Sequence, residues 1–131
     1  MGYEIIWEPR GVVKRFFGEV TSDDMLKSVA DSEGDSRFDE LRFVINDFLD
    51  ITAVSSSHHD VEEIAAIDSI AAVTNPRIKV AIVTTSPVVK EMAEGYINSP
   101  LNHYPTKIFQ TLAEGRQWIA QTPTPTKPAA K

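Results

Sequence analysis

Apolar and polar positions alternate along this chain in a pattern that predicts five strands. The first two are separated by a tight turn, in which Pro9 fixes one φ and Gly11 accepts a positive φ, so they form a hairpin. Lys14 and Arg15 within the second strand indicate a partly solvated face. The third and fourth strands are near-continuous apolar runs, typical of burial on both faces. The predicted strands span Tyr3–Glu8, Val12–Val20, Leu41–Ile45, Ile78–Thr84 and Lys107–Gln110.

Apolar residues at helical spacing predict four helices between and after these strands. Several starts carry residues that cap helices, among them Thr21 or Ser22, and Ser86 followed by Pro87. In the first helix we expect a buried stripe made of Met25, Leu26, Val29 and Ala30. The predicted helices run from Thr21 to the polar stretch Asp31–Arg37, from Asp60 to Thr74, from Ser86-Pro87 to about Ile97, and from Thr111 or Leu112 to Ala120.

The resulting order, β-β-α-β-α-β-α-β-α, predicts an α/β domain with a five-stranded mixed sheet. Strands that alternate with helices pair in parallel through right-handed crossovers. The first strand is joined to the second by a tight turn, so it must be antiparallel and is expected at an edge. Residues 1–120 are expected to form this one domain. Residues 121–131, with three prolines and no large apolar group, are expected to be a disordered tail.

Composition restricts the classes of function. The net charge of −6 argues against nucleic acid and anionic membranes as partners. There is no cysteine, which excludes disulfides, thiolate catalysis and cysteine-ligated metals. The first residues do not resemble a signal peptide, and no apolar run approaches the ~20 residues of a membrane span. We therefore expect a cytoplasmic protein without membrane insertion.

Polar side chains gather where the third and fourth strands are expected to end. In α/β sheets the carboxyl ends of the strands and the helix N-termini beside them are where ligands bind. The sequence therefore predicts a shelf that binds a protein partner or a small ligand. Its expected members are Asp47, Asp50, Ser55, Ser56, Ser57, His58, Thr84, Thr85 and Ser86.

Each part of this shelf has a structural interpretation as well. Any one of the serines at 55–57 is a natural helix cap, as are Thr85 and Ser86. His58, His59 and Asp60 are metal-type ligands, but adjacent residues do not converge on one ion, so no metal or other cofactor is expected. An alternative function is a small hydrolase that uses Asp47 with His58 or His59. No Gly-x-Ser-x-Gly motif supports a serine hydrolase.

Aromatic residues offer a different hypothesis. The hairpin and the loops contain more of them than short connections need. They either pack into the core or line an apolar groove for a ligand, and an exposed apolar face would also allow a homodimer through the hairpin edge or a helix. The residues concerned are Trp7, Phe16, Phe17, Phe48 and Tyr104.

The element order and several local strings resemble the STAS group, the SpoIIAA-like fold, and most nearly its uncharacterised bacterial single-domain branch. The strings are the opening hairpin, VAIVTTSP at 80–87 and KIFQTLAEGRQWI at 107–119. The resemblance spans Tyr3 to Ile119 and implies a non-enzymatic regulatory or ligand-binding role.

In the anti-sigma antagonists of this group, a serine at the start of the second helix is phosphorylated by a partner kinase. The resemblance places Ser56 or Ser57 at that position. The family pattern is Asp-Ser followed by Ser or Thr and Gly. This chain has neither that aspartate nor that glycine in the matching stretch, Ala53–His58.

Overall fold

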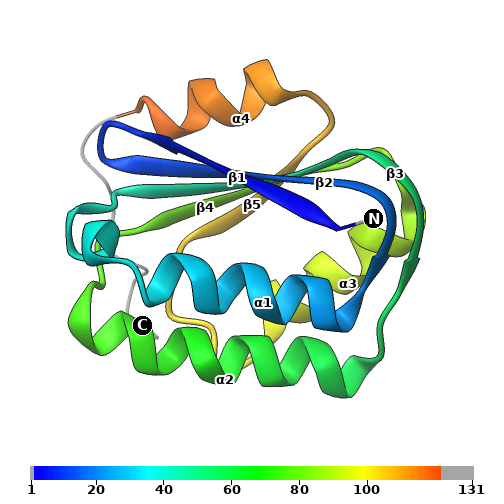
Figure 1. Ribbon diagram of the computed structural model, residues 1–131, viewed down its shortest axis with the longest axis horizontal. Helices are drawn as coiled ribbons and strands as arrows, with labels where there is room; N and C mark the ends of the chain where they lie inside the picture. Colours follow the sequence, from blue (N-terminus) through cyan, green and yellow to red (C-terminus); the bar gives the residue numbers. More distant parts are fainter. Residues whose placement is uncertain (1, 122–131) are drawn as a thin grey trace.

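The computed structural model describes residues 2–121, and its centre is a five-stranded sheet (Figure 1). Edge strand β1 is antiparallel to β2, and the remaining neighbours are parallel. The mixed α/β sheet predicted from the sequence is thus confirmed, with its hairpin at one edge. The strands are β1 (Tyr3–Glu8), β2 (Gly11–Thr21), β3 (Phe43–Ser55), β4 (Lys79–Val83) and β5 (Thr106–Phe109), and they lie in this order across the sheet.

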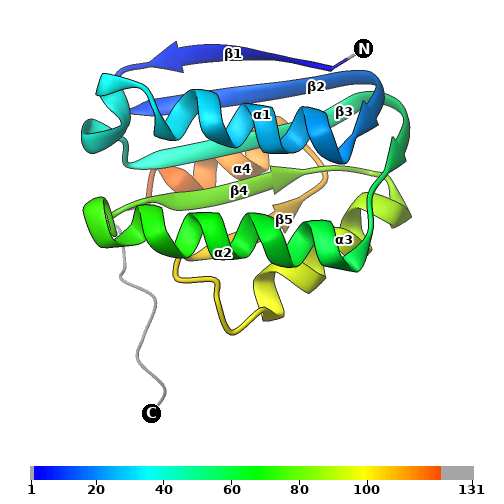
Figure 2. The same ribbon diagram turned by 60° about the horizontal axis from the view of Figure 1, so that its bottom comes forward.

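Helices cover both faces of the sheet unequally. Three of them, α1, α2 and α3, lie on one face, and α4 lies alone on the other (Figures 1 and 2). A short 3-10 helix, η1, follows α1 and was not predicted from the sequence. Within residues 2–121, no helix is both long and apolar enough to cross a membrane. The helical elements are α1 (Ser22–Glu33), η1 (Ser36–Glu40), α2 (His58–Thr74), α3 (Pro87–Asn98) and α4 (Leu112–Ile119).

Every α-helix begins with a side-chain cap, which is why local sequence predicted the helices well. Thr21, Ser57 and Thr111 each accept a hydrogen bond from the backbone three residues on, and an acidic residue there bonds back to the cap. Ser86 caps α3, with Pro87 as the first helical residue. The second helix starts at His58 rather than at Asp60, because Ser57 is the cap and Asp60 is its third residue.

The hairpin turn differs in detail from its prediction. The positive φ falls on Arg10, at 61°, and not on Gly11. Gly11 is needed for a different reason: a Cβ atom there would lie 2.0 Å from the ring of Phe43. The glycine therefore makes room for an aromatic side chain of the neighbouring strand.

Strand β3 is the main departure from the predicted boundaries, because it runs to Ser55 instead of ending at Ile45. Strand β2 is long enough to pair with it over this whole length, and register shifts occur between Arg15 and Phe17 and between Gly18 and Glu19. Strand β4 ends at Val83, so beyond that level β3 pairs with β2 alone. Polar residues are tolerated there because that part of β3 is largely exposed.

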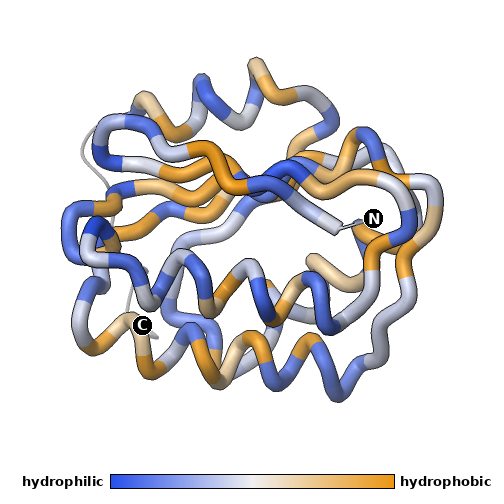
Figure 3. Tube along the Cα trace, viewed as in Figure 1, coloured by the Kyte–Doolittle hydropathy of each residue, from blue (hydrophilic) through white to orange (hydrophobic). Residues whose placement is uncertain are grey.

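The sheet separates two apolar layers, and hydrophobic residues concentrate along its strands (Figure 3). The larger layer lies under α1–α3 and the smaller one under α4. Phe16, Phe48 and Tyr104 are buried in the larger layer, whereas Trp7 and Phe17 are only partly buried. The predicted stripe of α1 was wrong at Ala30, which is exposed. The buried residues of α1 are Met25, Ser28, Val29 and Ser32.

Ser28 and Ser32 can be buried because their hydroxyls donate to carbonyls of their own helix. The expected tail at 121–131 lies, apart from Gln121, outside the described residues.

Candidate functional site

The predicted shelf is divided into two places by the length of β3. Asp47 pairs with Val83, so it lies next to Thr84 at the carboxyl end of β4. Ser55 and the start of α2 lie farther along, beyond the rest of β3. At about 3.3 Å per residue this separation exceeds ~20 Å. Asp47 and Asp50 are therefore strand residues, and not loop residues as predicted.

At the first of these places the polar groups already have partners. The carboxylate of Asp47, which is only 8% exposed, accepts a hydrogen bond of 2.9 Å from the Leu49 amide. Asp50 forms an ion pair with Arg15, at 2.8 Å from Nη2 to Oδ2. The Thr84 hydroxyl accepts a bond of 3.0 Å from the Ser86 amide, while Thr85 is exposed to solvent.

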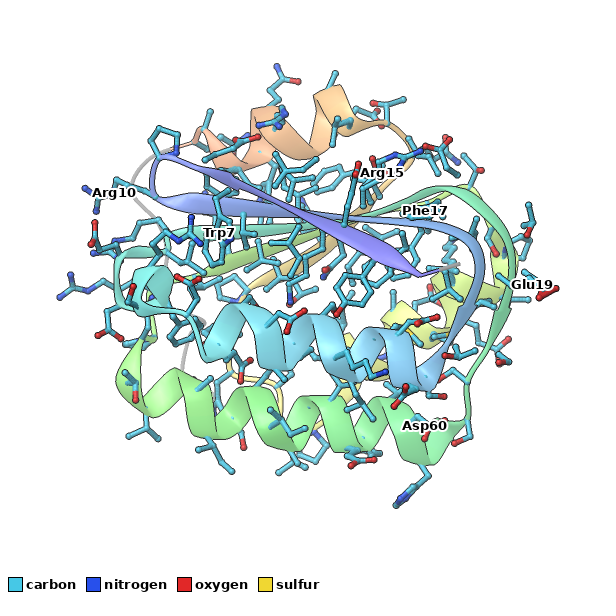
Figure 4. The ribbon with its side chains drawn as sticks, viewed as in Figure 1. Trp7, Arg10, Arg15, Phe17, Glu19 and Asp60 are labelled. Carbon is cyan, nitrogen blue, oxygen red and sulfur yellow. The ribbon has the colours of Figure 1, made fainter. Side chains whose placement is uncertain are left out.

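At the second place, the start of α2, Asp60 is the central group. Its Oδ2 accepts hydrogen bonds from the Ser57 amide at 2.8 Å and from the Ser22 hydroxyl at 2.6 Å. These bonds, above all that from Ser22, hold the pKa of Asp60 below its usual range. Asp60 and Arg15 lie on opposite sides of the sheet (Figure 4). The hydroxyl of Ser56 is buried and has no hydrogen-bond partner within residues 2–121.

The two histidines next to Ser57 do not form a site with Asp47. His58 is exposed at the first turn of α2, with Nε2 3.8 Å from Glu62 Oε1, and His59 is exposed beside it. Both are separated from Asp47 by the remainder of β3. Within residues 2–121, no group of three acidic or histidine side chains is placed to hold a metal ion.

The most unusual chemistry lies elsewhere, in a central cavity of about 120 Å³ between the sheet and helices α1–α3. Its walls are mostly apolar and include Phe16, Val80, Ile82 and Met92. Ionisable side chains from five segments nevertheless line it. They are Lys14 from β2, Glu33 from the end of α1, Asp68 from the middle of α2, Tyr96 from α3, and Tyr104 from the segment before β5.

Lys14 is the most strongly buried of these charged groups, at 4% exposed. Because side chains alternate along a strand, it lies on the same face of β2 as Val12 and Phe16, under the helices. The prediction of a solvated face at Lys14 was therefore wrong. Its ammonium makes no hydrogen bond and no close ion pair with residues 2–121. Burial lowers the pKa of Lys14 to about 8, although the more distant acidic groups Asp68, Glu33 and Asp31 oppose the shift.

Glu33 and Asp68 form an acidic pair between α1 and α2. The Tyr96 hydroxyl donates to Asp68 Oδ2 at 2.5 Å, and Glu33 is also hydrogen-bonded to Asp68. Burial and the neighbouring carboxylate raise the pKa of Glu33 far above its ordinary value. Glu33 therefore holds a proton at neutral pH and donates it to the Asp68 carboxylate.

Two further polar groups complete the cavity wall. Asn46 is paired with Lys14 across β2 and β3, and its side chain also makes no hydrogen bond within the described part of the chain. Tyr104 donates at 2.9 Å to the Asn75 carbonyl, and burial raises its pKa. The Tyr104 hydroxyl is thus already hydrogen-bonded, whereas the N–H groups of Lys14 and Asn46 could donate to a ligand.

A groove of about 340 Å³ lies next to this cavity. It lies between the end of α1, η1 and the second half of α2, and Glu33 and Phe38 line both spaces. On its outer side α2 exposes Ile70, at 73%. Glu33 therefore stands at the boundary between the groove and the cavity.

The sequence contains a signal for this cluster. Lys14 stands two residues from both Val12 and Phe16, so alternation requires it to share their buried face. Asp68 stands four residues after Ile64 in α2, on the side of that helix that turns to the core. A charged residue within an apolar stripe therefore indicates a buried ionisable group.

Comparisons with known proteins agree with this fold. No family model matches the sequence, and no curated protein matches it. Among solved structures, the chain is similar to the anti-sigma factor antagonist SpoIIAA in its unphosphorylated form, with a TM-score of 0.60 and 11% identity, over 90% of this chain and 97% of that one. It is also similar to the Bacillus cell fate determinant SpoIIAA in its phosphorylated form, with a TM-score of 0.58 and 16% identity, over 90% and 99% of the two chains.

A third similar structure is an uncharacterised DUF3478 protein from Shewanella loihica PV-4, described as having a SpoIIAA-like fold. Its TM-score is 0.53 and its identity 14%, over 91% of this chain and 93% of that one. These likenesses extend over nearly the whole described chain and bear out the resemblance inferred from the sequence. The chain therefore has the SpoIIAA-like fold.

Proposed function

We propose that this protein is a small-molecule-binding module that holds one largely apolar ligand in the central cavity, against Lys14. One observation carries the proposal: a lysine that is 4% exposed faces a mostly apolar cavity and donates no hydrogen bond within residues 2–121. An unpaired buried charge is costly, because transfer out of water removes its hydration. A ligand that brings an acceptor atom to Lys14 and Asn46 compensates for that loss.

The size of the cavity sets the size of the ligand. An engineered protein cavity of ~150 Å³ binds benzene, and the present cavity of about 120 Å³ is somewhat smaller. A compact ligand of roughly benzene size, with one polar end, fits these dimensions. The groove that shares Glu33 and Phe38 with the cavity is the entry route that we propose.

The role we propose is regulatory rather than catalytic. The fold is that of SpoIIAA, which is an anti-sigma factor antagonist, and this likeness supports a switch-like role without naming its partner. The ligand would contact α1, α2 and α3 together, since all three helices line the cavity. Occupancy would therefore change the packing of these helices, whose outer surfaces are available to a partner protein.

A second candidate function is a partner-kinase switch at the start of α2. It is favoured by the exposure of Ser57 at this position. Two features of Asp60 oppose it. The Ser57 hydroxyl accepts a hydrogen bond of 3.1 Å from the Asp60 amide. A phosphate on Ser57 would also lie beside the negatively charged Asp60 carboxylate. Ser56 is opposed by the burial of its hydroxyl. The cavity is for these reasons the preferred site.

Thermal unfolding with small alcohols tests the cavity proposal. We expect benzyl alcohol or 1-butanol to raise the melting temperature of the protein in a saturable way. Ala93 lies in the cavity wall and is 5% exposed, so Ala93→Leu should fill the space and abolish the effect. Ala113→Leu, on the exposed face of α4, is the matched control and should leave it intact. Equal responses of both variants would contradict the proposal.

A further inference from the structure

Among residues 2–121, Lys14 is the only primary amine on the wall of the central cavity. It is 4% exposed and lies beside Asn46, its partner across β2 and β3. The other lysine that is almost fully buried, Lys79, lies on the other face of the sheet and donates to two carbonyl oxygens. Lys27 is exposed and forms an ion pair with Asp23. Lys14 alone therefore combines an unoccupied amine with an apolar space in front of it.

The charges around the cavity select a neutral ligand. A carboxylate ligand would bring a second negative charge next to Asp68, in surroundings of low dielectric constant. An ammonium ligand would meet the positive charge of Lys14. A carbonyl compound avoids both penalties, and its oxygen can accept hydrogen bonds from Lys14 and from the Asn46 amide.

We propose that Lys14 captures an apolar aldehyde or ketone as a reversible imine, an inference that rests on the proposed ligand-binding function. The neutral amine of Lys14 attacks the carbonyl carbon, and a proton moves from nitrogen to oxygen to give the carbinolamine. The hydroxyl group then takes a proton from the Glu33 carboxyl and leaves as water, while the nitrogen lone pair forms the C=N bond. The resulting iminium has the carboxylates of Glu33 and Asp68 as counter-ions. Return of its proton to Glu33 gives the imine, so one carbonyl compound is consumed and one water is released.

The protonation states at neutral pH suit this reaction. The lowered pKa of Lys14, about 8, gives an appreciable fraction of neutral amine, which is the form that attacks carbonyl groups. Glu33 retains the proton that the leaving water needs, because its pKa is raised. The other titratable groups facing Lys14 are Asp31 of α1, Asp68 of α2, and the two tyrosines, Tyr96 and Tyr104. Both tyrosines have raised pKa values and remain neutral.

Reductive trapping tests the capture directly. The protein is incubated at pH 7.5 with benzaldehyde or butanal and sodium cyanoborohydride, and the adduct is located by peptide mass spectrometry. A trapped imine adds the mass of the aldehyde less one oxygen atom. We expect Lys14 to be modified at least about tenfold faster than Lys27, whose pKa is raised by its ion pair. Modification spread evenly over the exposed lysines would overturn the inference.

Matched variants and ligands separate this inference from the proposed function. Lys14→Arg keeps the charge but cannot form an imine, so the adduct should disappear, whereas Lys79→Arg should retain it. Should Lys14→Arg fail to fold, the peptide map of the unaltered protein decides alone. If benzyl alcohol raises the melting temperature but benzaldehyde leaves Lys14 unmodified, covalent capture is wrong and ligand binding stands. If neither compound acts, ligand binding in the cavity is wrong as well.

Discussion

Two lysines are buried in the described part of the chain, one on each face of the sheet, and they differ in what surrounds their ammonium groups. Lys79, 2% exposed, donates to the Trp118 carbonyl at 3.1 Å and to the Gln121 carbonyl at 2.9 Å, and its Nζ lies 5.1 Å from the centroid of the Trp118 ring. Lys14, 4% exposed, has no such partner within residues 2–121. Lys79 binds backbone carbonyls at the C-terminal end of α4, whereas Lys14 lines a cavity. A buried charge with partners serves the fold, and one without partners indicates a site.

The largest expected effect follows from removing the unmatched charge. The pKa of Lys14 falls from 10.5 to about 8 on folding, and each unit corresponds to about 1.4 kcal/mol. We therefore expect Lys14→Met to raise the free energy of unfolding at pH 7 by about 2–3 kcal/mol, measured by urea denaturation. The same variant should no longer form the aldehyde adduct. A loss of stability instead would mean that Lys14 is a structural residue.

The matched lysine should respond with the opposite sign. Lys79→Met removes the hydrogen bond to the Gln121 carbonyl and one of those to the Trp118 carbonyl, which keeps the Gln121 amide at 3.2 Å. It also removes the positive charge from the C-terminal end of α4. We expect the free energy of unfolding to fall by about 2 kcal/mol in the same urea experiment. Ligand binding in the cavity should persist, since Lys79 lies on the other face of the sheet. If both substitutions changed the free energy of unfolding by the same amount and in the same direction, the distinction between the two lysines would be wrong.

The dependence of stability on pH sharpens the comparison. Between about pH 8 and 10.5 the unfolded chain keeps a proton on Lys14 that the folded protein has released. The contribution of Lys14 to the free energy of unfolding therefore rises with pH between about 8 and 10.5. This contribution is lost as the pH falls through 8. We expect the advantage of Lys14→Met over the unaltered protein to be constant below pH 7 and to vanish towards pH 10.5. An advantage independent of pH would show that the charge of Lys14 is not its cause.

Glu33 supplies the opposite slope, because its pKa is raised in the folded state. The folded protein then binds the proton more tightly than the unfolded chain, so stability from Glu33 falls as pH rises above its ordinary pKa. Glu33→Gln should flatten the decline of stability between pH 5 and pH 8 while leaving the window of Lys14 above pH 8. Thermal unfolding across this pH range measures the change, and an unaltered slope would contradict the assignment.

Sequence reasoning succeeded where structure is decided locally and failed where it is decided by contacts across the fold. The bounds of β1 and the cap Ser86 follow from neighbouring residues alone. The length of β3 does not, because it depends on pairing with β2 far away in the chain. The polarity of Lys14 predicts exposure, but the sheet and three helices together enclose this side chain.

The candidate site was missed for the same reason. Its members, Lys14, Glu33, Asp68 and Tyr96, come from four separate elements, and no spacing within the sequence links them. The predicted shelf, by contrast, was a local cluster, and its members at the start of α2 are arranged as a helix cap. Neighbouring polar residues in a sequence were therefore the weaker indication of a site, and single charges within apolar stripes were the stronger one.

The smallest expected effect repeats the comparison between matched and unmatched groups at two adjacent serines. The Ser57 hydroxyl caps α2, so Ser57→Ala should lower the free energy of unfolding by about 1 kcal/mol. The buried hydroxyl of Ser56 has no partner in the described chain, so Ser56→Ala removes a polar group that folding leaves unsatisfied, and stability should stay within about 0.5 kcal/mol or rise. Urea denaturation of both variants measures the difference. If Ser56→Ala lowered the free energy of unfolding as much as Ser57→Ala, the buried Ser56 hydroxyl would make a stabilising hydrogen bond in solution. Ser56 would then be a group with a partner, like Ser57.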